Sequence, residues 1–162
     1  MRWLMTCAWW TAAVGVLLVV AGCASAPATT ISERVAGERI DSYVRETLRM
    51  VYSPLRFSRV RDGRGEGCAA AGFGGQVEPS VFYRASTIGL RRWEVRRFAA
   101  ATVAYWQSAG AGIERMENST VIHLRDHYRL AVAYYPAARR VEIRGVLNEC
   151  IWPKGTAPAE AR

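Results

Sequence analysis

Histidine, lysine and closely spaced cysteines are scarce in this chain of 162 residues. It has two histidines and four cysteines, and its 22 basic residues include a single lysine, Lys154. The cysteines and histidines lack the close spacing of a structural zinc site. The glycine-rich segment 62–75 (DGRGEGCAAAGFGG) has no Lys-Ser or Lys-Thr pair, so it does not match a phosphate-binding P-loop. We therefore predict no metal site and no cofactor.

The acidic and histidine side chains form no recognisable catalytic pattern. His123 falls in a predicted strand and Asp126-His127 in a predicted turn, so the two rings have no reason to converge. Glu142, Glu149 and Asp126 are scattered, whereas a glycosidase needs two carboxyl groups across one cleft. We expect no catalytic residues and no enzyme, although a small hydrolase remains the alternative.

The N-terminal segment has the pattern of an export signal. An uncharged, increasingly aliphatic stretch follows a basic N-terminus and stops at Val20-Ala21-Gly22-Cys23. This junction resembles the bacterial lipoprotein signal, in which an aliphatic and two small residues precede a cysteine. The resemblance implies removal of residues 1–22 and a diacylglycerol on the Cys23 thiol, which anchors the protein in the cell membrane facing outward. An uncleaved anchor is the alternative, and it leads to the same side of the membrane.

The cysteine count agrees with an exported protein. Cys7 would leave with the signal and Cys23 would carry lipid, so Cys68 and Cys150 remain. An even number of cysteines in an oxidising compartment indicates a disulfide, and we predict a bond between these two residues. A metal site is the alternative, but two cysteines far apart in the sequence match it poorly.

Hydrophobic periodicity predicts two helices and five strands in the rest of the chain. Apolar residues recur at helical spacing over 33–51 and 91–108, before a proline and a glycine respectively. Alternation predicts strands at 55–61, 76–85, 119–125, 128–135 and 141–147. The order α-β-β-α-β-β-β predicts an α+β fold, with an antiparallel sheet of about five strands and both helices packed on one face.

The expected layout has four parts, and one of them is a folded domain. They are a signal segment (1–22), a lipidated N-terminus and flexible tether (23–32), a single α+β domain (33–153) and a loose tail (154–162).

Positive charge is concentrated in the second predicted helix. The net charge of the chain is +8, and Arg91, Arg92, Arg96 and Arg97 crowd the first half of that helix. They are candidates for contact with an anionic surface, and a solvated helix face is the alternative. We expect no nucleic acid as partner outside the cell. The aromatic residues of this helix, Trp93, Tyr105 and Trp106, are expected in the core.

Several short motifs resemble those of small lipoproteins from high-GC Gram-positive bacteria. They are Tyr105-Trp106 near the end of a helix, Gly110 shortly after it, and Cys150-Ile151-Trp152-Pro153 after the last strand. The resemblance covers roughly residues 40–153. It implies a location in the cell envelope and an α+β domain, but no catalytic residues, because the activity of such proteins is unknown.

Together these features predict a non-catalytic accessory or interaction module of the cell envelope. The expected partners are the membrane, through the lipid on Cys23, and an envelope protein or anionic polymer. A small envelope hydrolase and a carrier of an apolar ligand are the alternatives.

Replacement of Cys23 with alanine tests the lipoprotein signal. We expect Cys23→Ala to abolish labelling with a radioactive fatty acid and to release or mislocalise the protein, because the thiol is the only attachment point for the diacylglycerol. Labelling of the variant at the level of the parent would refute lipidation at this residue.

Overall fold

The computed structural model describes residues 29–60, 66–68 and 75–158. The expected signal segment and Cys23 lie outside the described residues, as does most of the glycine-rich segment around Cys68. Neither helix of the described residues could span a bilayer.

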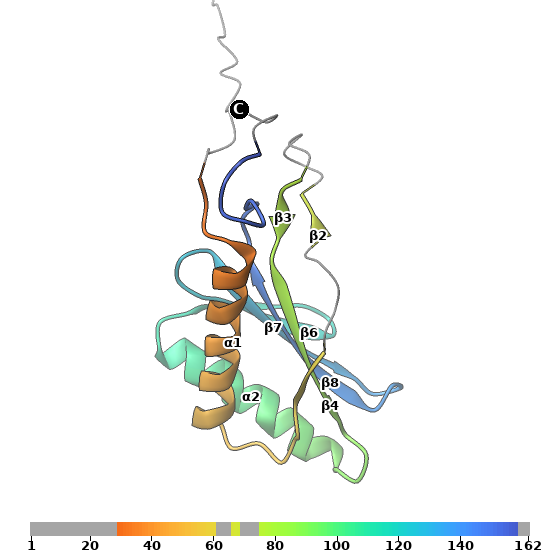
Figure 1. Ribbon diagram of the computed structural model, residues 1–162. Coiled ribbons are helices and arrows are strands. Elements are labelled where there is room, and N and C mark those ends of the chain that lie inside the picture. The colour runs from red at the N-terminus through yellow and green to blue at the C-terminus, as the bar shows by residue number, and fades with distance from the viewer. Residues whose placement is uncertain (1–28, 61–65, 69–74, 159–162) are drawn as a thin grey trace, which may run out of the picture.

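Two helices and a six-stranded antiparallel sheet form the domain, which confirms the predicted α+β class (Figure 1). The strand order is β1-β4-β8-β7-β6-β5, and β2 and β3 form a separate two-stranded ribbon. The helices are α1 (Glu33–Met50) and α2 (Arg92–Ser108), and the strands are β1 (Ser58–Val60), β2 (Glu66–Gly67), β3 (Val77–Glu78), β4 (Ser80–Ser86), β5 (Gly112–Arg115), β6 (Ser119–His123), β7 (Tyr128–Tyr135) and β8 (Arg140–Leu147).

The sequence predicted about five strands and did not predict β5, which is the sixth strand of the sheet. The segment after α2 begins Ala-Gly-Ala-Gly, and glycine is depleted in strands. The strand forms because residues 112–115 pair with β6 across a tight turn, in which the Met116 amide donates to the Ser119 carbonyl over 2.9 Å. The register places Ile113 opposite Ile122, so a tertiary contact outweighs the local preference.

The ends of α1 follow from its flanking residues. The Ser32 hydroxyl caps the first turn by accepting a hydrogen bond from the Val35 amide. Pro54 lies shortly after the helix and blocks its continuation. The buried positions Ala36, Ile40, Val44 and Thr47 recur at intervals of three or four, which gives the helix one inward face.

The second helix buries a similar stripe, and one expected core residue lies outside it. Val95, Phe98, Thr102 and Trp106 are buried, whereas Trp93 is 54% exposed. Two residues correspond to about 200° of helix rotation, so Trp93 points nearly opposite to Val95. The expectation that Trp93 belongs to the core is therefore wrong.

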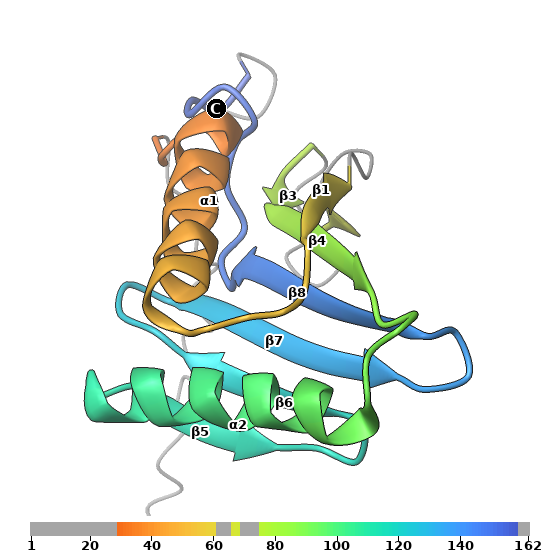
Figure 2. The same cartoon turned by 90° about the horizontal axis from the view of Figure 1, so that it is seen from below.

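Both helices cover the same face of the sheet. Figure 2 shows α2 running along β5 and β6, with α1 beside β8 and β4. A single cluster joins Val44 of α1 and Phe98 of α2 to Leu130 of β7 and Ile143 of β8. No helix of the described residues covers the other face of the sheet.

Close packing between α1 and β8 depends on Gly145. A Cβ atom at this position would lie 2.1 Å from Cγ2 of Ile40 and 3.3 Å from Cδ2 of Leu130. Ile40 and Leu130 are both at most 1% exposed, and a branched side chain cannot easily move out of a packed core. Glycine at 145 therefore sets how closely the helix approaches the sheet.

We expect Gly145→Ala to lower the free energy of unfolding by about 3 kcal/mol, because the added methyl group overpacks the contact with Ile40. Urea denaturation measures the change. Gly112→Ala is the matched control, since its Cβ would lie 3.5 Å from His123 Cβ, an ordinary contact. In a Gly145→Ala/Ile40→Ala double variant the loss should be smaller than the sum of the two single losses. Additive losses would show that the two residues do not clash.

Candidate functional site

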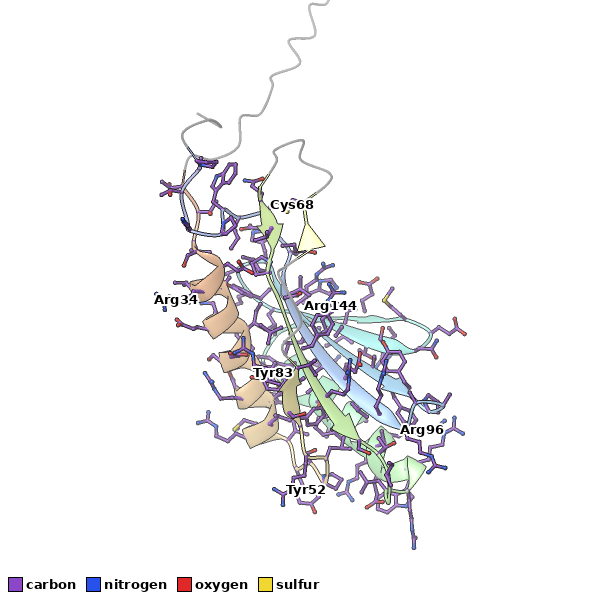
Figure 3. The ribbon with its side chains drawn as sticks, turned by 45° about the vertical axis from the view of Figure 1, so that its right-hand side comes forward. Arg34, Tyr52, Cys68, Tyr83, Arg96 and Arg144 are labelled. Atoms are coloured by element: carbon purple, nitrogen blue, oxygen red, sulfur yellow. A yellow bond between two sulfur atoms is a disulfide. The ribbon has the colours of Figure 1, made fainter. Side chains whose placement is uncertain are left out.

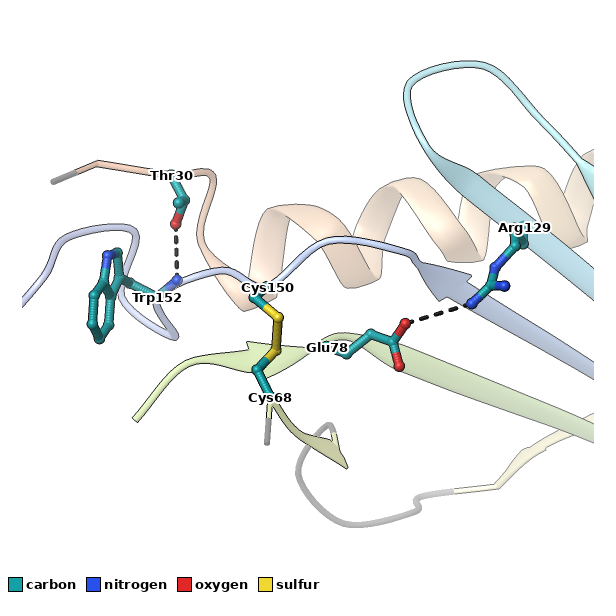
Figure 4. Close-up of a disulfide and its surroundings, with 6 residues drawn as sticks. All are labelled: Thr30, Cys68, Glu78, Arg129, Cys150 and Trp152. Carbon is teal, nitrogen blue, oxygen red and sulfur yellow. Dashed lines mark hydrogen bonds and ion pairs between the residues drawn. A yellow bond between two sulfur atoms is a disulfide. The ribbon is translucent and has the colours of Figure 1, made fainter. Parts of the chain in front are cut away.

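Three hydrogen bonds hold the N-terminal residues of the described chain against its C-terminal segment, and Figure 4 shows the one between Trp152 and Thr30. The Thr30 amide donates to the Gly155 carbonyl over 2.8 Å, and the Trp152 amide donates to Oγ1 of Thr30 over 2.9 Å. The Glu33 amide at the start of α1 donates to the Pro153 carbonyl over 3.0 Å. The chain therefore enters the domain beside the segment by which it leaves.

This pairing corrects the expected layout at both ends. Thr29 and Thr156 form a β-bridge, and Ala157 is only 4% exposed. Packed structure therefore extends beyond 33–153, into the expected tether and the expected loose tail. Gly155 has a φ of +83°, and a Cβ there would lie 3.0 Å from the Thr30 carbonyl oxygen, so the turn requires glycine.

A disulfide joins the same C-terminal segment to the loop before β3. Cys68 and Cys150 are bonded, with an S–S distance of 2.20 Å, which confirms the predicted pair. The next residue, Ile151, exchanges two backbone hydrogen bonds with Val77. Trp152 follows and is 1% exposed. We call residues 29–32, 68, 77 and 150–157 the terminal collar.

The opposite end of the sheet carries the β4–α2 loop and the β7–β8 turn (Figure 2). The two are joined, because the Thr87 amide donates to the Arg139 carbonyl over 2.8 Å. Ile88 stands at the tip of the loop and is 71% exposed. Gly89 follows with a φ of +81°, which allows the chain to reverse direction toward α2.

Five arginines gather at this end, and all five are exposed. They are the predicted Arg91, Arg92, Arg96 and Arg97, together with Arg139 of the β7–β8 turn. We call these arginines, with Ile88 and Trp93, the distal patch. Figure 3 shows Arg96 at the end of the molecule opposite Cys68.

The arginines of the distal patch have no carboxylate partner within the described residues, since none of the ion pairs found there includes them. Glu94, the acidic residue of the first turn of α2, accepts a hydrogen bond from the Arg91 amide over 2.7 Å. The N-terminal end of the helix dipole adds further positive potential. The patch is therefore suited to a negatively charged partner.

A long span of strand separates the distal patch from the terminal collar. β3 and β4 run from Val77, which pairs with Ile151, to Ser86, which precedes the loop of the patch. Nine residue steps of extended chain cover about 30 Å. The collar and the patch therefore occupy the two ends of the domain.

Within the described residues, the histidines and acids noted in the sequence are not gathered in one cluster, although His127 and Glu149 form a pair. Nε2 of His123 lies 3.0 Å from Glu114, and Nε2 of His127 lies 3.4 Å from Glu149, at exposed positions. Asp126 faces Arg39. Glu142 pairs with both Arg84 and Arg140 on the open face of the sheet. The described residues hold no group of three or more metal-binding side chains.

A hollow of about 640 Å³ lies between the N-terminal half of α1 and β4. Its most buried acidic group is Asp41, which accepts a hydrogen bond from the Tyr83 hydroxyl over 2.9 Å and pairs with Arg59 at 3.0 Å. Burial, and then this hydrogen bond, raises the pKa of Tyr83 to about 12. The phenol therefore keeps its proton at neutral pH and acts as a donor to Asp41 rather than as a base.

The lining of this hollow bears on the carrier and hydrolase alternatives. It includes the charged side chains Glu33, Arg34, Glu38, Asp41 and Arg59. Sites for apolar ligands have mainly apolar walls with few polar groups. Asp41 bonds to Tyr83 and Arg59, and Glu38 pairs with Arg34. The charged lining therefore does not favour a carrier of an apolar ligand, and these paired carboxylates give no specific support to a hydrolase.

Comparison of the chain with models of protein families, with curated proteins and with solved structures gives no match. The candidate site therefore rests on the residues themselves. Sequence reasoning found four arginines of the distal patch but missed Arg139, Ile88 and the exposure of Trp93. Arg139 belongs to an ordinary turn sequence between β7 and β8. Only the pairing of β8 with β4 and β7 brings it close to the arginines of α2.

Loss of the disulfide should loosen the terminal collar. We expect Cys68→Ser/Cys150→Ser to lower the free energy of unfolding by about 4 kcal/mol, because the bond closes a loop with a sequence separation of 82. Hydrogen exchange should quicken at the amides of Thr30 and Ile151 before it does in the core of the sheet. Two free thiols in the exported parent protein, measured by mass spectrometry, would contradict the pairing.

Proposed function

We propose that the protein is a lipid-anchored, non-catalytic module of the cell envelope, facing outward, and that its distal patch binds an anionic partner. The single observation that carries the binding role is the set of five exposed arginines at one end of the domain that have no carboxylate partner among the described residues. The anchor rests on the junction Val20-Ala21-Gly22-Cys23.

The position of the terminal collar supports this division of roles. Six residue steps separate Cys23 from Thr29, and extended chain of that length spans about 20 Å. An anchor on Cys23 would therefore hold the collar end close to the bilayer. The distal patch lies about 30 Å further along the sheet and remains accessible to a partner.

Arginine suits such a role for reasons of geometry. A guanidinium group donates two parallel hydrogen bonds to a carboxylate or phosphate and stays charged at any physiological pH. Several such groups on one rigid helix and an adjoining turn present a fixed array. The array also attracts anions over a longer range, and salt weakens that attraction.

Retention on an anionic matrix tests the patch. We expect the full-length protein, in detergent, to bind polyphosphate beads, and Arg92→Gln/Arg96→Gln to elute at clearly lower salt, because two charges are removed from one array. Arg45→Gln/Arg125→Gln is the matched control, since it removes the same charge from exposed positions outside the patch. Equal shifts for both variants would show that only net charge matters and would refute a specific site.

A further inference from the structure

We infer that the distal patch docks on the surface of a bilayer that contains anionic lipids, with Ile88 and Trp93 entering the headgroup region. This inference rests on the proposed binding role of the patch and names the partner. The arginines would pair with lipid phosphates, while the two apolar side chains would leave water.

Two exposed apolar side chains flank the first arginines of the patch. Ile88 stands at the loop tip, and Trp93 lies on the outer side of the first turn of α2. A single exposed apolar residue needs no explanation, but here two lie within six residues of each other among arginines. Tryptophan favours the level of lipid headgroups, and arginine reaches phosphates from the same depth.

The backbone of the loop is suited to a partly apolar environment. The Thr87 amide donates to the Arg139 carbonyl, the Ile88 amide to Oγ of Ser86 over 3.2 Å, and the Leu90 amide to the Thr87 carbonyl over 3.1 Å. Three donors around the tip are thus satisfied within the protein. If the tip enters the headgroup region, these three amides keep their hydrogen bonds within the protein. The free-energy cost of unpaired amides away from water is therefore reduced.

These features favour a bilayer over a soluble polyanion. A polyanion would use the arginines but would gain nothing from an exposed isoleucine at a loop tip. The side chain of Leu90, by contrast, packs against the hydrophobic core, so the loop directs one apolar residue inward and another outward. An exposed loop with an apolar residue at its tip and arginines beside it suits the headgroup region of a bilayer.

Tryptophan fluorescence reports the docking directly. The described residues contain three tryptophans, of which Trp106 and Trp152 are buried and Trp93 is exposed. The lipidated mature protein, which would begin at Cys23 and lack Trp3, Trp9 and Trp10, is anchored in neutral phosphatidylcholine vesicles. It is mixed with vesicles containing phosphatidylglycerol and a brominated lipid that quenches tryptophan. A second arm places the anionic and brominated lipids in the anchoring vesicle itself.

We expect quenching in at least one arm, and its loss in Trp93→Phe. Ile88→Gln should weaken the vesicle interaction about tenfold, because one isoleucine no longer leaves water. Val35→Gln is the matched control, since Val35 is also exposed but lies in the first turns of α1, near the terminal collar. Arg92→Gln/Arg96→Gln should weaken it tenfold or more.

The outcomes separate this inference from the proposed function. Retention on polyphosphate without quenching in either arm would overturn the bilayer as partner and leave a soluble polyanion or a protein. Equal effects of Ile88→Gln and Val35→Gln would also overturn it, because the loop tip would then have no special role. If the parent protein itself does not bind polyphosphate beads, the proposed binding role of the distal patch is refuted.

Discussion

The pairing of the first and last described segments at the terminal collar is the constraint on which the rest of the structure depends. Backbone hydrogen bonds join Thr30 to Gly155 and Val77 to Ile151, and the disulfide fixes Cys150 beside them. β4 starts at this end and β8 finishes there. The opposite ends of these strands therefore lie away from the terminal collar, and the distal patch occupies that end. The disulfide and the hydrogen bonds of the collar thus fix one end of the domain, and the distal patch lies at the other end.

The distribution of charge follows the same division. On the sheet and along α1, arginines such as Arg59, Arg84 and Arg129 each have a carboxylate neighbour. The chain has 22 basic and 14 acidic residues. Within the described residues, the five arginines of the distal patch lie together and have no carboxylate neighbour. Mutual repulsion makes this arrangement unfavourable by itself, so a negative partner would relieve it.

Much of the fold could be predicted because it depends on short-range patterns. The Ser32 cap, the glycine after α2 and the alternation in β7 and β8 are each visible within a few residues. The failures have different causes. β5 depends on its pairing with β6 across a tight turn, which outweighs the low strand preference of glycine. The exposure of Trp93 follows from its angular position on α2, and the packing of residues 155–157 depends on Thr29 and Thr30, which are distant in the sequence.

For this protein the sequence alone determined both helices, the strands β7 and β8, the α+β class and the paired cysteines, because hydrophobic period, capping residues and an even thiol count are local or compositional properties. It also indicated the lipoprotein signal and four of the arginines. Only the tertiary structure decided that Arg139 and Ile88 join those arginines, and that Gly145 admits Ile40. Strand order and register bring such residues together, and these are properties of the whole sheet.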